Sequence, residues 1–152
     1  MNDLERIERF IAKHHLLTLA TCKNNKPYCC SSFYAYDTNT KSFIIAGDKK
    51  TTHMQNALNN PHVAANIHLE TTQVGKIEGL QIEGILHICE DEALKKLYFK
   101  TFPYAKAMRP ILWQLTPSRF KLTDNRLGFG KKIILNADSI QNRAVSDQNR
   151  TP

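Results

Sequence analysis

One stretch decides the fold of this chain: Phe43-Ile44-Ile45-Ala46-Gly47-Asp48-Lys49-Lys50-Thr51-Thr52-His53-Met54-Gln55. The apolar run at 43–46 predicts a short strand that ends at a glycine. Residues 54–58 predict a helix, which the sequence Asn59-Asn60-Pro61 terminates. Between the strand and the helix, the chain is therefore expected to form a turn rich in lysine, threonine and histidine.

A turn of this composition is a candidate site for a phosphate group. The first N–H groups of a helix have no partners inside the helix and favour an anion, and lysine and threonine side chains add further donors. The residues that supply these donors are Lys49, Lys50, Thr51, Thr52 and His53. The alternative interpretation is structural, with Thr52 and Gln55 forming a capping box and the lysines solvated. The turn alone leaves both interpretations open.

The rest of the chain predicts mostly strands. Asn2 can cap a first helix with helical apolar spacing, and a second substantial helix begins at Glu90-Asp91-Glu92. Strands are expected at 16–22, 28–37, 42–46, 62–69, 76–89 and 111–122. Six strands in sequence with few helices imply a mostly antiparallel barrel, because closing a sheet removes its edges. A short apolar run at 133–135 follows the last expected strand.

Length and composition fit a single folded domain. The 152 residues are enough to bury a core, and residues 1–135 are expected to form it. From Asn136 onward, serine, aspartate, asparagine, glutamine and arginine dominate. Such a segment buries too little apolar surface to offset its ordering entropy. Residues 136–152 are therefore expected to be a disordered tail.

The same sequence predicts a cytoplasmic protein without membrane contact. No apolar run approaches the roughly 20 residues that span a bilayer, and charged residues interrupt the N-terminus where a signal peptide is apolar. The four cysteines form no C-x-x-C pair and are expected to be free thiols: Cys22, Cys29, Cys30 and Cys89. The six histidines show no recognised ligand spacing, so no metal site is expected.

The net charge of +7 raises the question of nucleic-acid binding. Lysines gather at a few separate places, and no basic stripe runs along one helix. Aromatic residues are not interleaved with basic ones, as in proteins that stack single-stranded bases. An anionic small ligand needs only a few of these charges. Nucleic acid is therefore kept only as a minor alternative.

Three later sequences and the order of the elements carry a family resemblance. The sequences are Trp113-Gln114-Leu115, Phe120-Lys121-Leu122-Thr123-Asp124-Asn125 and Leu127-Gly128-Phe129-Gly130-Lys131-Lys132. With the three-strand meander, the lysine-threonine-histidine turn and the helix ending in Asn-Asn-Pro, residues 1–135 resemble the pyridoxamine 5′-phosphate oxidase-like family. The three sequences are similar to its YhbP-like branch, a name to which no activity is attached. The resemblance implies a mainly β fold, an FMN-binding, six-stranded antiparallel split β-barrel with flanking helices.

The resemblance also implies a cofactor site. In the family, the strand before the turn contacts the isoalloxazine ring of FMN through its backbone, and this strand corresponds here to Ile44, Ile45, Ala46 and the adjoining Gly47. The family turn reads as a hydroxyl residue, one further residue and a lysine. Counted back from Asn60-Pro61, Thr51 takes the hydroxyl position and His53 the lysine position, and the positive charges move to Lys49 and Lys50. Histidine titrates near neutral pH, so His53 is a weaker, pH-dependent phosphate partner than lysine.

Family members are usually homodimers with two flavins between the protomers, and the resemblance implies the same assembly here. The second wall of the flavin site then corresponds to Trp113 and to the segment Gly128–Lys132, whose Lys131 can neutralise a phosphate or a reduced flavin. The alternative is that Trp113 fills the core and the segment is an exposed basic turn. Both interpretations stay open at this point.

Two function hypotheses follow. The leading one is an FMN-binding flavoprotein that acts as an oxidoreductase on an unknown small-molecule substrate, where the flavin carries the chemistry. The second is a non-catalytic module that binds flavin or haem as a sensor, store or carrier. The second gains support from His53 in the lysine position and from the lack of a nameable proton donor. No catalytic residue is assigned. The sequence shows no arrangement of a nucleophile with a base, so it gives no reason to expect hydrolysis.

Overall fold

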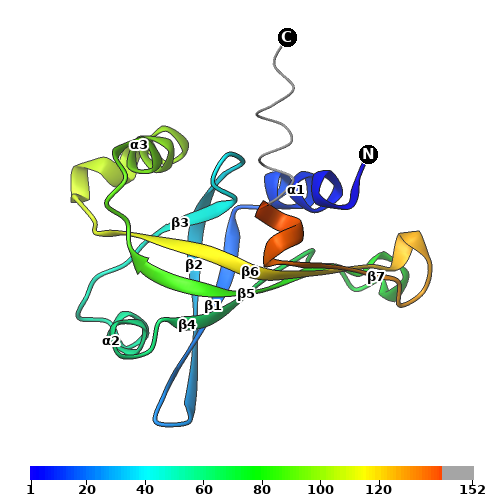
Figure 1. Cartoon of the computed structure of the whole chain (residues 1–152), viewed down its shortest axis with the longest axis horizontal. Helices are drawn as coiled ribbons and strands as arrows, with labels where there is room; N and C mark the ends of the chain where they lie inside the picture. Colours follow the sequence, from blue (N-terminus) through cyan, green and yellow to red (C-terminus); the bar gives the residue numbers. More distant parts are fainter. Residues whose placement is uncertain (142–152) are drawn as a thin grey trace.

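The computed structural model describes residues 1–141 of the chain (Figure 1). In chain order the elements are α1 (Asp3–Lys13), β1 (Leu16–Lys23), β2 (Lys26–Asp37), β3 (Ser42–Ala46), α2 (Thr52–Asn59), β4 (His62–His68), the 3₁₀ turn η1 (Val74–Lys76), β5 (Glu78–Ile88), α3 (Glu92–Thr101), η2 (Pro103–Met108), β6 (Leu112–Asp124), η3 (Asn125–Leu127) and β7 (Lys132–Asn136).

The strands form one antiparallel sheet in the order β3-β2-β1-β4-β5-β6-β7. An additional pairing joins β3 to the first half of β6, so that the first six strands close into a barrel. The fold class expected from the sequence is confirmed, with one correction to the strand count. The apolar run at 133–135 becomes β7, a seventh strand that pairs with the second half of β6 beyond the closure.

Local sequence explains why the first elements form. Asn2 and Glu5 make a reciprocal capping box at the start of α1, as the asparagine predicted. In the hairpin between β1 and β2, Asn24 and Asn25 both have positive φ angles, 51° and 59°. Two such residues suit the tight turn that matches the twist of paired strands. The long hairpin projects beyond the barrel at the bottom of Figure 1.

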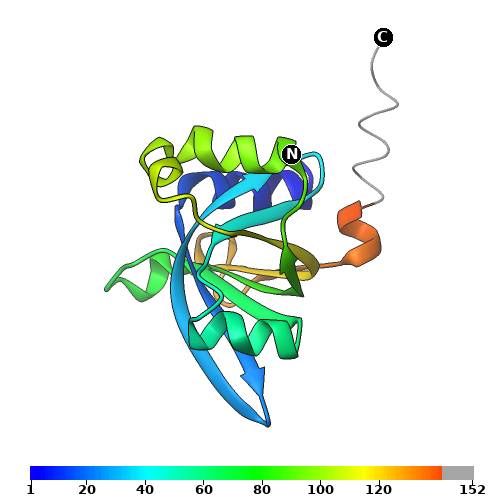
Figure 2. The same ribbon diagram turned by 90° about the vertical axis from the view of Figure 1, so that its left-hand side faces the viewer.

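Two apolar clusters position the functional regions. The main core fills the barrel and includes the inward face of α1, and its largest fully buried side chains are Trp113, Phe10, Phe43 and Phe120. A smaller cluster lies outside the barrel, where α3 covers apolar residues of β2, β3 and β6. Both views place α1 and α3 on one side of the barrel and α2 on the opposite side (Figure 1 and Figure 2).

The folded domain extends past the expected boundary at residue 135. Asn136 ends β7, and residues 137–141 form a helical turn whose Ile140 is fully buried in the main core. The expectation of a disordered tail therefore does not hold for residues 136–141, because one isoleucine in a polar segment is enough to anchor the turn. The remainder of that predicted tail, residues 142–152, lies outside the described residues.

The structure also bears on the state of the cysteines and on membrane-spanning helices. All four cysteines are free thiols, and burial raises the pKa of the Cys30 and Cys89 thiols above the ordinary value. Within residues 1–141, no helix is long and apolar enough to cross a bilayer.

Candidate functional site

The predicted phosphate turn connects β3 to α2, and Thr51 is its organising residue. The Thr51 hydroxyl donates to the Asp48 carbonyl at 2.7 Å and accepts the Met54 N–H at 3.4 Å, so Thr51 is the N-cap of α2. The Asp48 carboxylate accepts the Lys50 N–H at 2.8 Å. The structural alternative with Thr52 as the cap is wrong, because Thr52 is already the first residue of the helix.

Lys49 and Lys50 present their charges to solvent beside this helix start. Both residues are exposed, and within residues 1–141 neither side chain forms an ion pair. The backbone around them is fixed, because Gln55 donates through Nε2 to the Lys49 carbonyl. The turn thus combines two ammonium groups with the positive end of a helix dipole.

His53 is half-buried in the first turn of α2. Its Nε2 lies 3.3 Å from the Thr51 hydroxyl oxygen. Burial lowers the pKa of His53 below the ordinary value of a histidine, so the ring is neutral at neutral pH. The positive charge of the turn is therefore carried by the lysines, and His53 acts as a neutral hydrogen-bonding group beside them.

The strand residues predicted to contact a ring divide into two pairs. Ile44 and Ile45 are fully buried, and β3 is paired on both edges, with β2 and with β6. The sheet therefore already uses their backbone N–H and C=O groups. Ala46 and Gly47 lie at the end of the strand, are partly exposed, and are the two predicted ring contacts that border open space.

Trp113 supports the turn from inside the protein. It is 1% exposed, and its indole N–H donates to the Gly47 carbonyl at 2.9 Å. The Gly47 N–H in turn donates to the Ile111 carbonyl at 3.0 Å. A methyl group at position 47 would lie 2.2 Å from the Met54 Cε, so only glycine fits without a shift. Trp113 thus fills the core beneath the turn, as the alternative interpretation expected, and a contact with the cofactor stays a prediction.

A pocket of about 530 Å³ adjoins the turn, and sequence reasoning missed one of its walls. Ala46, Gly47 and Asp48 form one side, and the other comes from α3, η2 and the segment before β6: Tyr98, Ala105, Met108, Arg109, Pro110 and Ile111. Arg109 has a left-handed backbone with φ of 49°, which is uncommon for a residue other than glycine. The available signal was the pair Pro103 and Pro110, which bracket a segment too short for a regular helix.

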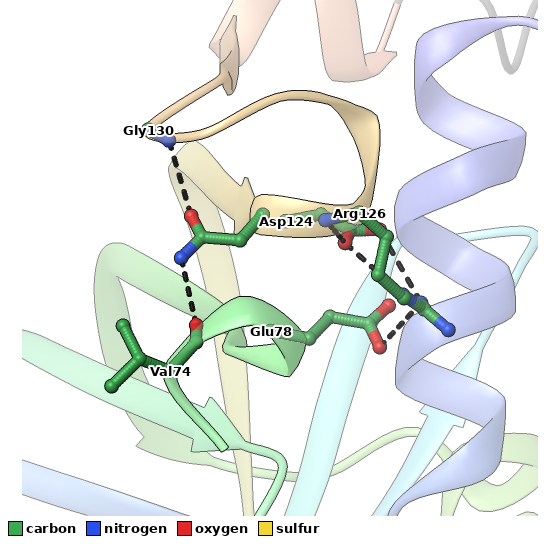
Figure 3. A network of polar contacts seen from close by, with 6 residues as sticks. Val74, Glu78, Asp124, Arg126 and Gly130 are labelled. Carbon is green, nitrogen blue, oxygen red and sulfur yellow. Dashed lines mark hydrogen bonds and ion pairs between the residues drawn. The ribbon is translucent and has the colours of Figure 1, made fainter.

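Lys131 lies far from this turn within one chain. It belongs to the loop that follows η3, at the end of the molecule opposite the turn and α2 (Figure 1). An ion-pair network holds this loop (Figure 3): Arg126 contacts the Glu78 carboxylate at 2.7 Å and that of Asp124 at 3.2 Å. Asn125 donates to the Val74 carbonyl at 3.0 Å and accepts the Gly130 N–H at 3.1 Å.

This network explains much of the Thr123–Lys132 sequence as structure. Glu78 and Asp124 are buried carboxylates, and burial raises the pKa of Glu78, against the lowering effect of Arg126. Gly128 and Gly130 have positive φ angles of 132° and 71°. The loop presents Phe129, which is 87% exposed, together with the exposed Lys131. Contact of Lys131 with a cofactor at the turn therefore requires a second protomer.

Known sequences match this chain over most of its length. Residues 4–122 match the family model described as pyridoxamine 5′-phosphate oxidase. A UPF0306 protein of Cronobacter sakazakii is 34% identical over 137 residues, which cover 88% of this chain and 95% of that protein. A UPF0306 protein of Klebsiella pneumoniae is 33% identical over 136 residues, covering 88% and 92%.

Solved structures show the same fold at low sequence identity. A haem-binding protein from Mycobacterium smegmatis superposes with a TM-score of 0.77 at 14% identity, over 93% of this chain and 61% of that one. A Listeria innocua protein assigned as a pyridoxamine 5′-phosphate oxidase gives 0.68 at 15% identity, over 80% and 98%. A FAD-binding protein from Mesorhizobium loti gives 0.63 at 13% identity, over 79% and 90%.

Proposed function

Because this chain belongs to the pyridoxamine 5′-phosphate oxidase family, we propose that it is a flavoprotein that holds the phosphate of FMN at the Gly47–His53 turn. The observation that carries the proposal is the state of Lys49 and Lys50. Both are exposed beside the capped start of α2, and neither pairs with a carboxylate in the described part of the chain. Two such charges at a helix N-terminus favour a dianionic phosphate.

The neighbouring pocket fits the rest of such a ligand. Its volume of about 530 Å³ is in the range of small-molecule sites, and most of its lining is apolar. It begins at Ala46 and Gly47, next to the proposed phosphate site, so one ligand can occupy both. Gly47 and Trp113 fix the rim, because the indole N–H holds the Gly47 carbonyl.

The proposed function includes a redox role with an unknown substrate. When bound, FMN supplies the electron-transfer chemistry of such a protein. The chain contributes binding by the lysines, orientation by the Thr51-capped turn, and exclusion of water by the apolar wall of α3 and η2. Tyr98 lines the pocket, and burial raises the pKa of its hydroxyl, which keeps the hydroxyl protonated at neutral pH.

A second candidate function is non-catalytic binding of flavin or haem. The fold is shared with a haem-binding protein of M. smegmatis and with a FAD-binding protein of M. loti. Among the lining residues that the structure describes, Asp48 is the one carboxylate, and it accepts the Lys50 N–H. The pocket therefore offers no carboxylic acid poised to donate a proton, which favours a carrier, sensor or store.

We further propose that the protein is a homodimer. The cross-strand pair Leu16 and Phe33 lies on the outer face of β1 and β2, and the two side chains are 51% and 55% exposed. A second protomer on this face would cover them and could bring its own Phe129 and Lys131 to the turn. Sedimentation equilibrium is expected to give a dimer for the native chain and a monomer for the Leu16→Lys, Phe33→Lys variant.

The absorption spectrum of the purified protein tests the cofactor. Flavin bands, or their appearance on FMN addition and desalting, support the proposal, and a Soret band supports the haem alternative. A colourless protein that retains neither cofactor contradicts both. Bleaching of the bound flavin by NADH or NADPH under anaerobic conditions, at a rate well above that of free FMN, then separates a redox enzyme from a binding module.

A further inference from the structure

A second pocket lies away from the turn, and half of the chain's histidines line it. It has a volume of about 410 Å³ and lies between the end of α1, the first residues of β1 and the end of β4. Its lining residues come from four segments of the chain: Lys13 to Thr18, Ser31, Asn66, and His68 to Glu70. His14, His15 and His68 are three of the six histidines in the sequence.

His14 lies close enough to three other groups of the pocket for their charges to disfavour its protonated form: His15, His68 and Lys13. Burial lowers the pKa of His14 most, and the charges of His15, His68 and Lys13 lower it further. The His14 ring packs against the Phe10 ring in a tilted arrangement, with a centroid separation of 4.5 Å and an interplanar angle of 46°, which restricts its position at the pocket. Asn66 Nδ2 lies 3.4 Å from His68 Nδ1. These surroundings therefore disfavour protonation of His14, and a bound anion reverses this effect.

The rest of the lining favours an anion over a cation. Thr18 and Ser31 add hydroxyl donors and Asn66 an amide, whereas Glu70 is the one carboxylate among the lining residues that the structure describes. Among residues 1–141, no group of three or more histidine, cysteine, aspartate or glutamate side chains is arranged to hold a metal ion. Convergent N–H and O–H donors with titratable cations match the oxygens of a phosphate monoester.

We propose that this histidine pocket, lined by Lys13, His14, His15, Asn66 and His68, binds a tetrahedral oxyanion of the phosphate-monoester class. Within one protomer, this pocket shares no lining residue with the pocket beside the turn at Gly47–His53, and Leu16 places it at the edge of the proposed dimer face. The ligand is a small anionic metabolite or the phosphate end of a larger one, and both present the same oxygens to the histidines.

The binding is coupled to protons in a defined direction. The titratable and charged groups that face the pocket are Lys13 from α1, His14 and His15 from the linker, and His68 and Glu70 from β4 and the residues after it. A bound anion favours the protonated imidazoles, so it raises their pKa values. By linkage, affinity rises as pH falls through the histidine range and weakens above it.

Histidine ring resonances in NMR spectra test the proposal directly. The probe is sulfate, because its charge is constant across the histidine range, compared with chloride at matched ionic strength. Sulfate is expected to raise the pKa of His14, His15 and His68, and to leave His87, which is exposed on β5, unchanged. His53 reports the turn in the same spectra, so failure of the phosphate turn and failure of the histidine pocket are seen separately.

A variant and its matched control complete the test. His14→Gln, His68→Gln is expected to weaken binding of sulfate and of phenyl phosphate about tenfold at about pH 6, whereas His87→Gln leaves both affinities unchanged. Affinity that also falls about tenfold between about pH 6 and about pH 8 supports the proton coupling. Identical pKa values in sulfate and chloride for the three pocket histidines, or an equal shift at His87, would overturn the proposal.

Discussion

The turn at Gly47–His53 and the loop at Asp124–Lys131 lie at opposite ends of the molecule, and both present lysines on short connections (Figure 1). They are held in different ways. The turn is fixed by a helix cap and by a tryptophan beneath it, and its polar side chains are largely at the surface. The loop is fixed by two buried carboxylates that share one arginine (Figure 3).

The difference shows that a polar motif contains two kinds of residue: those that fix the backbone conformation and those that are free to contact a ligand. In the turn, Asp48 and Thr51 hold the backbone conformation through hydrogen bonds, and the Lys49 and Lys50 side chains are exposed to solvent. In the loop, Asp124, Asn125 and Arg126 hold the backbone conformation, and the Phe129 and Lys131 side chains are exposed to solvent.

The largest effect on stability is expected at Trp113, under the turn. Trp113→Ala should lower the free energy of unfolding by about 3–5 kcal/mol, because it leaves a cavity in the main core. Trp113→Phe keeps most of the volume but leaves the Gly47 carbonyl without its donor, at a cost of about 1–2 kcal/mol. Urea denaturation measures both. An alanine variant with near-native stability would contradict the core role.

The next effect is expected in the loop. Arg126→Ala leaves Glu78 and Asp124 buried without their cation and should cost about 1–3 kcal/mol, the half-exposed arginine reducing the effect. The matched control is Arg119→Ala, because Arg119 pairs with Glu83 in an exposed ion pair that contributes about 0–1 kcal/mol. Equal losses of unfolding free energy in the two variants would show that Arg126 contributes no more to stability than an arginine in an exposed ion pair.

The Arg126 effect should depend on pH with a definite sign. Burial raises the pKa of Glu78 in the folded protein, so folding favours its protonated form. This contribution is present below the unfolded pKa and is lost as pH rises through the raised folded pKa. Without Arg126 the pKa of Glu78 rises further. The stability difference between native and Arg126→Ala proteins should therefore shrink on acidification from neutral pH, and Glu78→Gln should abolish most of this dependence.

A smaller effect distinguishes the two threonines of the turn. Thr51→Ala removes the N-cap of α2 and should cost about 1 kcal/mol. Thr52→Ala changes an exposed position inside the helix and should stay within about 0.5 kcal/mol of the native value. Thermal unfolding of both variants shows which substitution costs more stability. A larger loss for Thr52→Ala would support Thr52 as the helix cap and contradict the structure.

Local patterns predicted the elements that rest on neighbouring residues. The Asn2 cap, the strand at 42–46 and the helix that ends before Pro61 each depend on contacts within a few positions. The seventh strand was missed because residues 132–136 become a strand only by pairing with β6 outside the barrel closure. Ile140 was missed because a single apolar residue in a polar segment gives no periodic signal.

The residues of the candidate site likewise include some that neighbouring residues predict and others that only the fold explains. The lysines and the helix start could be read from adjacent residues, whereas the choice of Thr51 over Thr52 needed the actual backbone. The role of Trp113 depends on its register opposite Ile45, which places its indole under Gly47. The wall formed by Met108 and Arg109 comes from a segment about sixty positions away, and only the packing of α3 over β3 brings it to the turn.

The proposed phosphate site at the Gly47–His53 turn can be tested by comparing the affinities of the protein for FMN and riboflavin, since riboflavin lacks only the phosphate. Fluorescence titration of the native protein should give FMN about tenfold or greater preference over riboflavin. In Lys50→Ala, Thr51→Ala this preference should vanish through loss of FMN affinity alone, and in the control Lys96→Ala, an exposed position on α3, it should persist. Equal affinities in the native protein, or an undiminished preference in the double variant, would contradict the account.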